Sequence, residues 1–295
     1  MSDPRFEAPA PLDPPIIFTP LGIRFWDAAL DAPITDGLTV TAREPDSRGK
    51  VTLAVRTLSG VYAFHGLAGM HAIEYPAGSA AGASAPPTPF IIEVVDTLGR
   101  YLPTAFRAPV PYAGIFPTQT VASALGEPPP GVILFSAPTR VVRPTLAVIR
   151  AELRDAAAAF RPAAYAVLDA HVGPRRWTGV ADAQGRVMIV LPYPTFSAPA
   201  GTSLIPSAGA GASQRWPVTL SVRYGPAELS PIAGGQAPDL KSILSQSPGV
   251  IWQSLPSLPG APAGELATEL VFGQELVVRT DDESALLISP AVSPL

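Results

Sequence analysis

Proline limits what this chain can fold into more than any other residue, because 37 of its 295 residues are prolines. Proline cannot donate a backbone hydrogen bond and interrupts helices, so this density favours short strands joined by rigid loops. With the 25 glycines, it makes up about a fifth of the chain, below the roughly 25–30% typical of disordered sequences. The apolar share of 47% lies within the roughly 45–50% of globular proteins. We therefore expect a folded protein built from β-strands.

The length and the spacing of the strand-like segments predict two domains. One sandwich has about 100 residues, so 295 residues fit two sandwiches with extensions. Sets such as Leu38/Val40/Ala42 show the period of two expected of a half-buried strand. The predicted fold class is all-β, with two tandem antiparallel β-sandwiches of the immunoglobulin or transthyretin type. The predicted divisions are an N-terminal Pro-rich arm (1–15), a first sandwich (16–116), a linker (117–131), a second sandwich (132–228) and a C-terminal extension with a short helix and two strands (229–295).

An internal repeat indicates that the two sandwiches are copies of one module. Asp27–Ala42 and Asp155–Ala170 each have 16 residues, begin with Asp-Ala-Ala, contain a proline midway and end in an alternating stretch. Each copy continues with a polar turn that ends in glycine, Gly60 or Gly185, and leads into a strand. The period of 128 residues is much longer than the roughly 20–50 residues of solenoid repeats. A duplicated domain is therefore expected, with the second copy diverged from the first.

The segment 145–159 is open to two interpretations. Its four consecutive alanines favour a helix by propensity. The repeat instead aligns Ile149–Leu153 with the strand-like Ile23–Trp26, which places the alanines in a turn. The repeat favours the strand and the turn.

The chain has few charged residues, 15% against about 25% in an average soluble protein. One interpretation is that other subunits cover part of the surface; the other is that Pro, Ser, Thr and Ala fill the loops. The net charge of −4 and the single adjacent basic pair, Arg175–Arg176, provide no basic patch for nucleic acid. We expect protein partners within an oligomeric assembly, and no nucleic acid.

The absence of cysteine excludes disulfides and thiolate metal sites, which suits a reducing cytoplasm. The first residues lack the basic-then-apolar pattern of a signal peptide. The apolar runs, such as Val187–Leu191, are far shorter than a membrane span. We expect a soluble cytoplasmic protein without a membrane span.

Candidate catalytic and metal-binding residues are few. His71, Glu74 and the distant His171 have the spacing of a zinc carboxypeptidase ligand set. The strand-rich context argues against that α/β enzyme, and a loop histidine with a surface glutamate is favoured. We interpret the three carboxylates at 281–283 as a polar turn between two strands in preference to a calcium site, and His65 as a turn residue. The prediction is therefore no catalytic, cofactor-binding or metal residues, no cofactor and no enzyme activity.

Two tryptophans, Trp26 and Trp216, lie in strand-like segments and are expected to anchor the core. Small residues dominate the loops 77–89 and 197–213, and whether these loops bind a ligand stays open.

The order of motifs in each copy resembles the carboxypeptidase regulatory-like, or transthyretin-like, β-sandwich family over about 50 residues. The matching residues of the first copy are Asp27, Pro33, Ile34, Val40, Ala42, Gly60, Tyr62 and Phe64. Those of the second copy are Asp155, Pro162, Ala163, Leu168, Ala170, Gly185, Val187 and Ile189, without the aromatic pair. The resemblance implies rigid spacer or adhesive modules that are not catalytic.

A second resemblance spans most of the chain. It rests on the runs Gly22–Asp27, Thr97–Pro103, Leu134–Arg140, Leu191–Pro194, Gln214–Val218 and Glu269–Gly273. These runs look like a protein found beside the sheath, tube and baseplate of bacterial phage tail-like contractile injection particles. The resemblance implies a baseplate, cap or accessory subunit that is assembled in the cytoplasm and that leaves it only in a released or membrane-attached particle.

Under this hypothesis the two sandwiches form a rigid body, while residues 1–15 and 229–295 tie it to sheath, tube, cap or baseplate proteins. The alternative is a carbohydrate- or cell-surface-binding module. A zinc-dependent hydrolase is the third interpretation.

Overall fold

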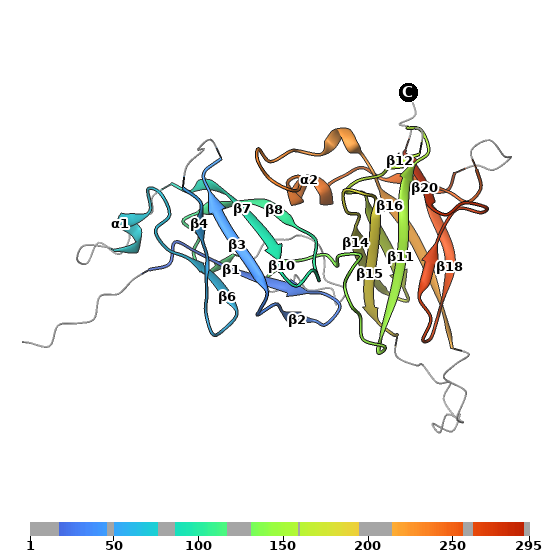
Figure 1. Cartoon of the computed structure of the whole chain (residues 1–295), viewed down its shortest axis with the longest axis horizontal. Helices are drawn as coiled ribbons and strands as arrows, with labels where there is room; N and C mark the ends of the chain where they lie inside the picture. The colour runs from blue at the N-terminus through green and yellow to red at the C-terminus, as the bar shows by residue number, and fades with distance from the viewer. Residues whose placement is uncertain are drawn as a thin grey trace, which may run out of the picture.

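The computed structural model describes residues 18–45, 50–75, 86–116, 131–158, 160–194, 214–255 and 262–291. The predicted arm, most of the predicted linker, most of the loop 77–89 and the whole loop 197–213 lie outside these residues. The regular structure of the described chain is almost entirely strands, with two short α-helices, α1 (His71–Glu74) and α2 (Leu240–Leu244), and one 3-10 turn at Pro226–Glu228. The two modules lie side by side, each made of two sheets (Figure 1). The prediction of an all-β fold with tandem β-sandwiches is confirmed.

The first module packs a sheet in the order β10-β1-β6-β5 against a sheet in the order β4-β3-β7-β8. Its core forms because apolar residues alternate along the strands; Leu21, Ile23 and Phe25 of β1 are all fully buried. The strands are β1 (Leu21–Asp27), β2 (Ala32–Pro33), β3 (Leu38–Arg43), β4 (Thr52–Leu53), β5 (Val55–Arg56), β6 (Val61–Phe64), β7 (Thr88–Asp96), β8 (Thr104–Val110), β9 (Ile115–Phe116) and β10 (Val132–Ile133).

The second module repeats this plan around β11, whose even-numbered side chains face outward and whose odd-numbered side chains are buried. One sheet has the order β14-β13-β16-β18, and the other has the order β12-β11-β20-β17, with β15 and β19 also paired to β11. The strands are β11 (Leu146–Asp155), β12 (Arg161–Pro162), β13 (Val167–Val172), β14 (Arg175–Val180), β15 (Arg186–Pro192), β16 (Arg215–Arg223), β17 (Gly249–Trp252), β18 (Glu265–Val271), β19 (Leu276–Val278) and β20 (Leu286–Pro290).

The strand pairing shows that the sequence repeat is a structural duplication. Phe25 pairs with Val132 in a parallel ladder, and Leu153, 128 residues after Phe25, pairs with Leu286 in the same way. Pro33 and Pro162 occupy the same place, since they pair with Trp26 and Arg154. Because these residues are 129 positions apart, the turn of the second copy is one residue longer. The contested segment is strand β11 followed by a turn, as the repeat favoured.

The duplication places two boundaries differently from the prediction. Strand β10 pairs with β1, so residues 132–133 belong to the first module and not to the second. Residues 117–130 of the predicted linker, with their proline run, lie outside the described residues, but the strands before and after them, β9 and β10, both pair with β1 of the first module. Residues 229–295 contain the predicted short helix, but strands β17, β18, β19 and β20 complete the sheets of the second module. These four strands are therefore integral to the second sandwich.

A segment between β16 and β17 joins the two modules; we call residues 225–248 the clamp. It contains α2, which lies over the junction in Figure 1. Leu240 and Ile243 of α2 belong to the core cluster of the first module, together with Val167 and Val180 of the second. Ile232 packs on Ile91 and Ala105 on the outer side of β7 and β8. In the first copy the strands equivalent to β16 and β18, which are β7 and β8, are joined by a short connection, so the clamp and β17 are an insertion in the second copy.

No helix within the described ranges is long and apolar enough to span a membrane.

The turn at Gly185 provides a test of the fold. Gly185 has φ +80°, and a Cβ there would lie 2.4 Å from the Leu153 carbonyl oxygen. Gly173 has φ +61° with nothing within 4 Å of a Cβ. We expect Gly173→Ala to lower the free energy of unfolding by about 1 kcal/mol, the cost of a left-handed backbone. Gly185→Ala should lose roughly 1–3 kcal/mol more, since it also overpacks the turn. Urea denaturation followed by circular dichroism measures both, and equal losses would contradict the packing around β11.

Candidate functional site

Each module holds a buried aspartate where its first long strand ends. Asp27 accepts hydrogen bonds from the amides of Ala29 and Leu30 at 2.9 and 3.3 Å. Asp155 accepts the same bonds from Ala157 and Ala158, also at 2.9 and 3.3 Å. These bonds explain the repeated Asp-Ala-Ala, because an aspartate that caps the amides two and three residues ahead closes the turn.

Each aspartate also accepts a hydrogen bond from a tyrosine that lies far away in the sequence. Tyr101 donates to Oδ2 of Asp27 at 2.5 Å, and Tyr224 donates to Oδ2 of Asp155 at 3.0 Å. Burial, and next the charge of the aspartate, raise the pKa of both tyrosines above the ordinary value. Both phenols therefore stay protonated as donors. Each aspartate connects the end of one strand to the opposite sheet of its sandwich.

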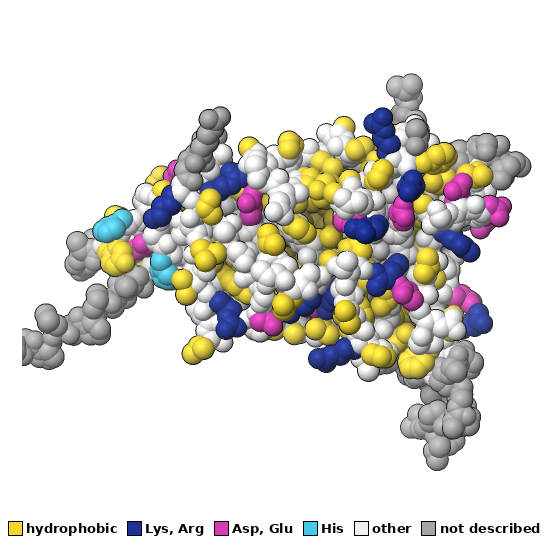
Figure 2. Space-filling view, in the orientation of Figure 1, with side chains coloured by type: hydrophobic (Ala, Val, Ile, Leu, Met, Phe, Trp, Pro, Cys, Tyr) yellow, Lys and Arg dark blue, Asp and Glu magenta, His cyan; other side chains and the backbone are white. Residues whose placement is uncertain are grey.

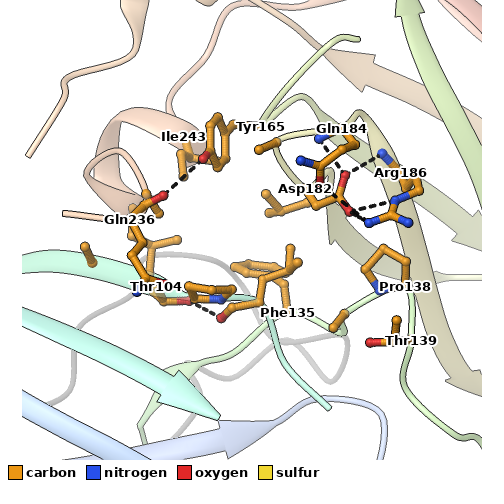
Figure 3. A pocket seen from close by; sticks show the side chains of 18 residues that line it. Thr104, Phe135, Pro138, Thr139, Tyr165, Asp182, Gln184, Arg186, Gln236 and Ile243 are labelled. Carbon is orange, nitrogen blue, oxygen red and sulfur yellow. Dashed lines mark hydrogen bonds and ion pairs between the residues drawn. The ribbon is translucent and has the colours of Figure 1, made fainter. Parts of the chain in front are cut away.

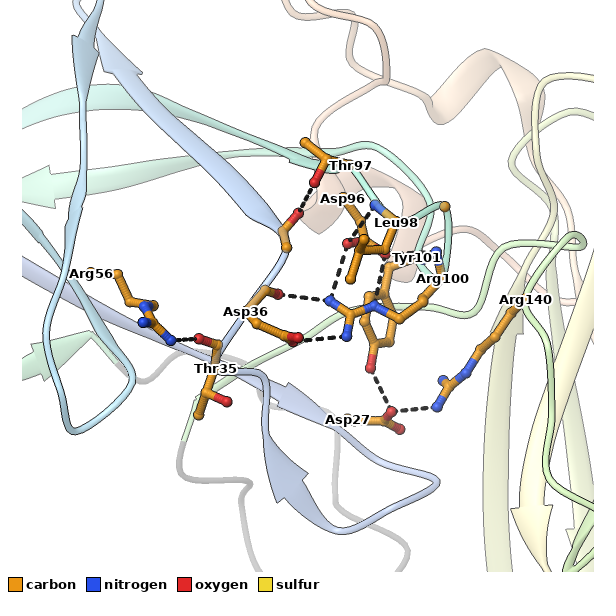
Figure 4. A network of polar contacts seen from close by, with 12 residues as sticks. Asp27, Thr35, Asp36, Arg56, Asp96, Thr97, Leu98, Arg100, Tyr101 and Arg140 are labelled. Carbon is orange, nitrogen blue, oxygen red and sulfur yellow. Dashed lines mark hydrogen bonds and ion pairs between the residues drawn. The ribbon is translucent and has the colours of Figure 1, made fainter.

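The first aspartate also carries a buried ion pair. Arg140 donates from Nη2 to Oδ2 of Asp27 at 2.5 Å, and both side chains are less than a tenth exposed. The guanidinium carbon lies 5.0 Å from the ring centroid of Tyr101, and Nη1 donates to Ser136 at 2.9 Å. Figure 4 shows Asp27, Tyr101 and Arg140 meeting at the junction. Arg140 belongs to the segment 134–145, which we call the connector because it leads from β10 to β11.

Backbone contacts hold the connector to the β7–β8 hairpin. Leu102 donates its amide to Phe135 at 2.9 Å, and Ala137 donates to Arg100 at 2.9 Å. On the other side, Arg150 of β11 donates to the carbonyl oxygen of Pro138. The connector is therefore fixed to both modules.

The two sides of the junction have the same turn, Asp-x-x-Gly-Arg, at Asp96–Arg100 and Asp182–Arg186. In each turn the aspartate carboxylate accepts hydrogen bonds from the backbone amides two and four residues ahead. The side chain of the arginine donates a further hydrogen bond to the same carboxylate. Burial would raise the pKa of Asp96, but the hydrogen bonds from the Arg100 side chain and from the Arg100 and Leu98 amides outweigh it. The pKa of Asp96 is therefore lowered. Each turn therefore places an aspartate–arginine ion pair on its own side of the junction between the modules.

A cavity of about 280 Å³ lies between the modules. Hydrophobic side chains gather in a hollow at the middle of the face shown in Figure 2. In Figure 3, Tyr165, Gln236 and Ile243 lie on one side, Asp182, Gln184 and Arg186 on another. The four parts that line it are the start of β8, the connector, the clamp and the region of the second module that includes the turn at Asp182.

The clamp closes one side of this cavity. Tyr165, whose backbone has φ +59°, donates its hydroxyl to the Gln236 carbonyl oxygen at 3.2 Å. Gln246 donates to the Tyr165 carbonyl oxygen at 2.8 Å. Arg107 of β8 pairs with Asp239 at 2.8 Å. The cavity wall is therefore built by hydrogen bonds from both modules.

The candidate residues of the sequence do not meet in this cavity. His71 and Glu74 are in α1 of the first module, where Glu74 is buried and accepts the Gly66 amide at 2.6 Å. His171 is on β13 of the second module, so the structure does not bring the zinc set together. Over the described residues no three His, Asp or Glu side chains are grouped to hold a metal ion. Residues 281–283 form a turn between β19 and β20, and His65 follows β6 in an exposed position.

Of the two tryptophans expected to anchor the core, one contacts it. Trp216 is half-buried but packs against the core of the second module, Trp26 is half-buried outside the core clusters, and Trp177 on β14 is a buried core residue. The sequence reasoning did not identify the cavity either. The one sequence signal for it is the second Asp-x-x-Gly-Arg turn.

Comparisons with known proteins do not identify the chain. No family model and no curated protein matches it. Among solved structures, the TIE protein of Bacillus anthracis matches 86% of this chain and 44% of its own chain, with 7% identity and a TM-score of 0.22. The chain thus spans less than half of that protein. The function has to be inferred from the residues of the chain itself.

The two buried aspartates give a paired prediction. Asp27→Asn should lower the free energy of unfolding by about 3–5 kcal/mol, because it leaves the buried Arg140 without its counter-charge. Asp155→Asn should lose only about 1–2 kcal/mol, since no buried cation is left unpaired: the two amides keep the oxygen of the new side chain, and its NH2 group can donate to the Tyr224 hydroxyl oxygen. Guanidinium denaturation of both variants measures the difference. Equal losses would contradict the ion pair as the added stabilising contact of the first module.

The lowered pKa of Asp96 predicts an acid dependence of stability. A carboxyl whose pKa is lower in the folded state stabilises that state above its unfolded pKa of about 3.9, and this stability is lost as pH falls through the folded value. We expect Asp96→Asn to flatten the decline in unfolding free energy below about pH 5. Asp36→Asn is the matched control, because Asp36 contacts the same Arg100 but its side chain is 64% exposed. An unchanged acid profile in Asp96→Asn would contradict the prediction.

Proposed function

We propose that this chain is a non-catalytic structural subunit of a multiprotein assembly, most specifically a baseplate, cap or accessory component of a phage tail-like contractile injection particle. The observation that carries the proposal is that two separate ties fix the two modules relative to each other. They are the connector with its buried ion pair, and the clamp, whose Asp239 pairs with Arg107 and whose Leu240 and Ile243 enter the core of the first module. A subunit that sets the spacing between neighbours needs such a fixed body. The particle itself is proposed from the sequence resemblance.

An exposed apolar edge of the first module supports a protein partner. The segment 51–56 leaves one sheet as β4 and enters the other as β5, so it is the edge strand of both. Its alternate side chains Val51, Leu53 and Val55 are 56%, 61% and 60% exposed. Exposed apolar edge strands favour pairing with another chain. This supports the interpretation that the low charge of the sequence reflects surface covered by other subunits.

One observation supports the alternative of a carbohydrate-binding module. Tyr193, Trp216 and Phe272 form an aromatic cluster near the ends of β15, β16 and β18, with ring centroids 5.4 and 4.7 Å apart. Aromatic rings on a protein surface offer flat apolar faces, which can stack on sugars. Phe272 is 40% exposed. Tyr193 and Trp216 are partly buried against the core of the second module, whereas Val51, Leu53 and Val55 are all exposed, so we place this function second.

The test is affinity purification of the tagged chain from its native host, with mass spectrometry of the proteins that accompany it. We expect sheath, tube, cap or baseplate proteins. The variant with Val51→Ser, Leu53→Ser and Val55→Ser should lose them, while its thermal unfolding stays intact. The matched control is Glu265→Ser, Ala267→Ser and Glu269→Ser, which alters the exposed face of another edge strand, β18. A chain that purifies alone as a monomer overturns the proposal, and saturable binding on a glycan array would favour the alternative.

A further inference from the structure

We propose that the cavity between the modules is a binding site for a compact apolar molecule that bears a carboxylate, with Arg186 as the group that contacts the carboxylate. This site is independent of the assembly proposed above.

The size and walls of the cavity fit the apolar part of such a molecule. Its volume is about 280 Å³, whereas an apolar cavity of roughly 150 Å³ already holds benzene. The walls are side chains fixed in both modules, since Phe135, Leu240 and Ile243 are each less than a twentieth exposed. A preformed apolar pocket with a few polar groups at one side is the usual form of a small-molecule site.

The charged groups favour an anion over a cation. The Asp182 carboxylate accepts the Gln184 and Arg186 amides, both at 2.9 Å, and the Arg186 Nε at 2.9 Å. Its side chain is only 11% exposed, whereas that of Arg186 is 52% exposed. The accessible member of the ion pair is therefore the guanidinium, whose donors suit a carboxylate.

The remaining polar groups of the cavity are compatible with a ligand whose part away from the carboxylate is uncharged. Thr104 already donates its hydroxyl to the Leu102 carbonyl oxygen, and Thr139 donates to Gly99. The Gln236 carbonyl oxygen accepts from Tyr165. Because each of these groups already has a hydrogen-bond partner within the protein, the walls away from Arg186 present mainly apolar surface to a ligand. A bound molecule would contact both modules and would stabilise their arrangement.

The experiment uses 4-phenylbutyrate and its neutral analogue 4-phenylbutyramide as probes, titrated into the full chain by calorimetry and NMR. We expect saturable binding of the carboxylate that is about tenfold tighter than that of the amide, as for one charged hydrogen-bonded contact. Arg186→Gln should abolish this preference, and Arg186→Lys should keep part of it. Arg215→Gln is the matched control, because Arg215 is also an exposed arginine paired with a carboxylate, 3.0 Å from Glu269, but lies outside the cavity lining.

A second part of the experiment fills the cavity with larger side chains. Ala137→Leu and Ala237→Leu each place a larger side chain on a different wall. Both should weaken the binding of both probes at least about tenfold, and the unfolding temperature reports whether each variant is folded. The proposal is overturned if the carboxylate does not bind saturably, if the amide binds equally well, or if a folded filled variant binds as the original chain does.

Discussion

The carboxylate of Asp27 is the contact on which the arrangement of the two modules depends. It closes the first turn through two amides, reaches the opposite sheet through Tyr101 and holds the connector through Arg140. A buried charge is costly unless every partner is present. Folding of the first module and placement of the connector are therefore coupled, because Arg140 finds its counter-charge only when β1 and the β7–β8 hairpin are in place.

The sequence predicted the duplication because the duplicated features are local. Asp27 and Asp155 cap turns through amides two and three residues ahead, and Gly60 and Gly185 both adopt positive φ. Such requirements are visible as residue types at fixed spacing. The repeat also settled the segment 145–159, where propensity alone favoured a helix. The fold class followed from the same local signals.

The module boundaries and the cavity were not predictable in this way. Strand β10 has two residues and pairs with β1 more than 100 positions earlier, so no local pattern assigns it to either module. The clamp contains prolines and a short helix, which resemble a tail until Leu240 and Ile243 are seen in the core of the other module. The cavity arises where four separate parts of the chain meet, and neither composition nor periodicity reports such a meeting.

Comparison of one turn in the two copies shows how a duplicated module acquired a new surface. Thr57 and Val61 of the first copy correspond to Asp182 and Arg186 of the second, since Val61 pairs with Arg24 and Arg186 pairs with Glu152, 128 residues later. The Thr57 hydroxyl accepts the Val61 amide at 3.0 Å, as Asp182 accepts the Arg186 amide at 2.9 Å.

The backbone of the turn is therefore maintained in both copies while its chemistry differs. In the first copy the turn is uncharged, and Leu58 at its tip is fully exposed. In the second copy the same turn faces the first module and carries an ion pair into the cavity. The threonine hydroxyl already meets the structural requirement of the turn, so the fold alone does not require the arginine. Its position beside an apolar cavity is what a carboxylate ligand would use.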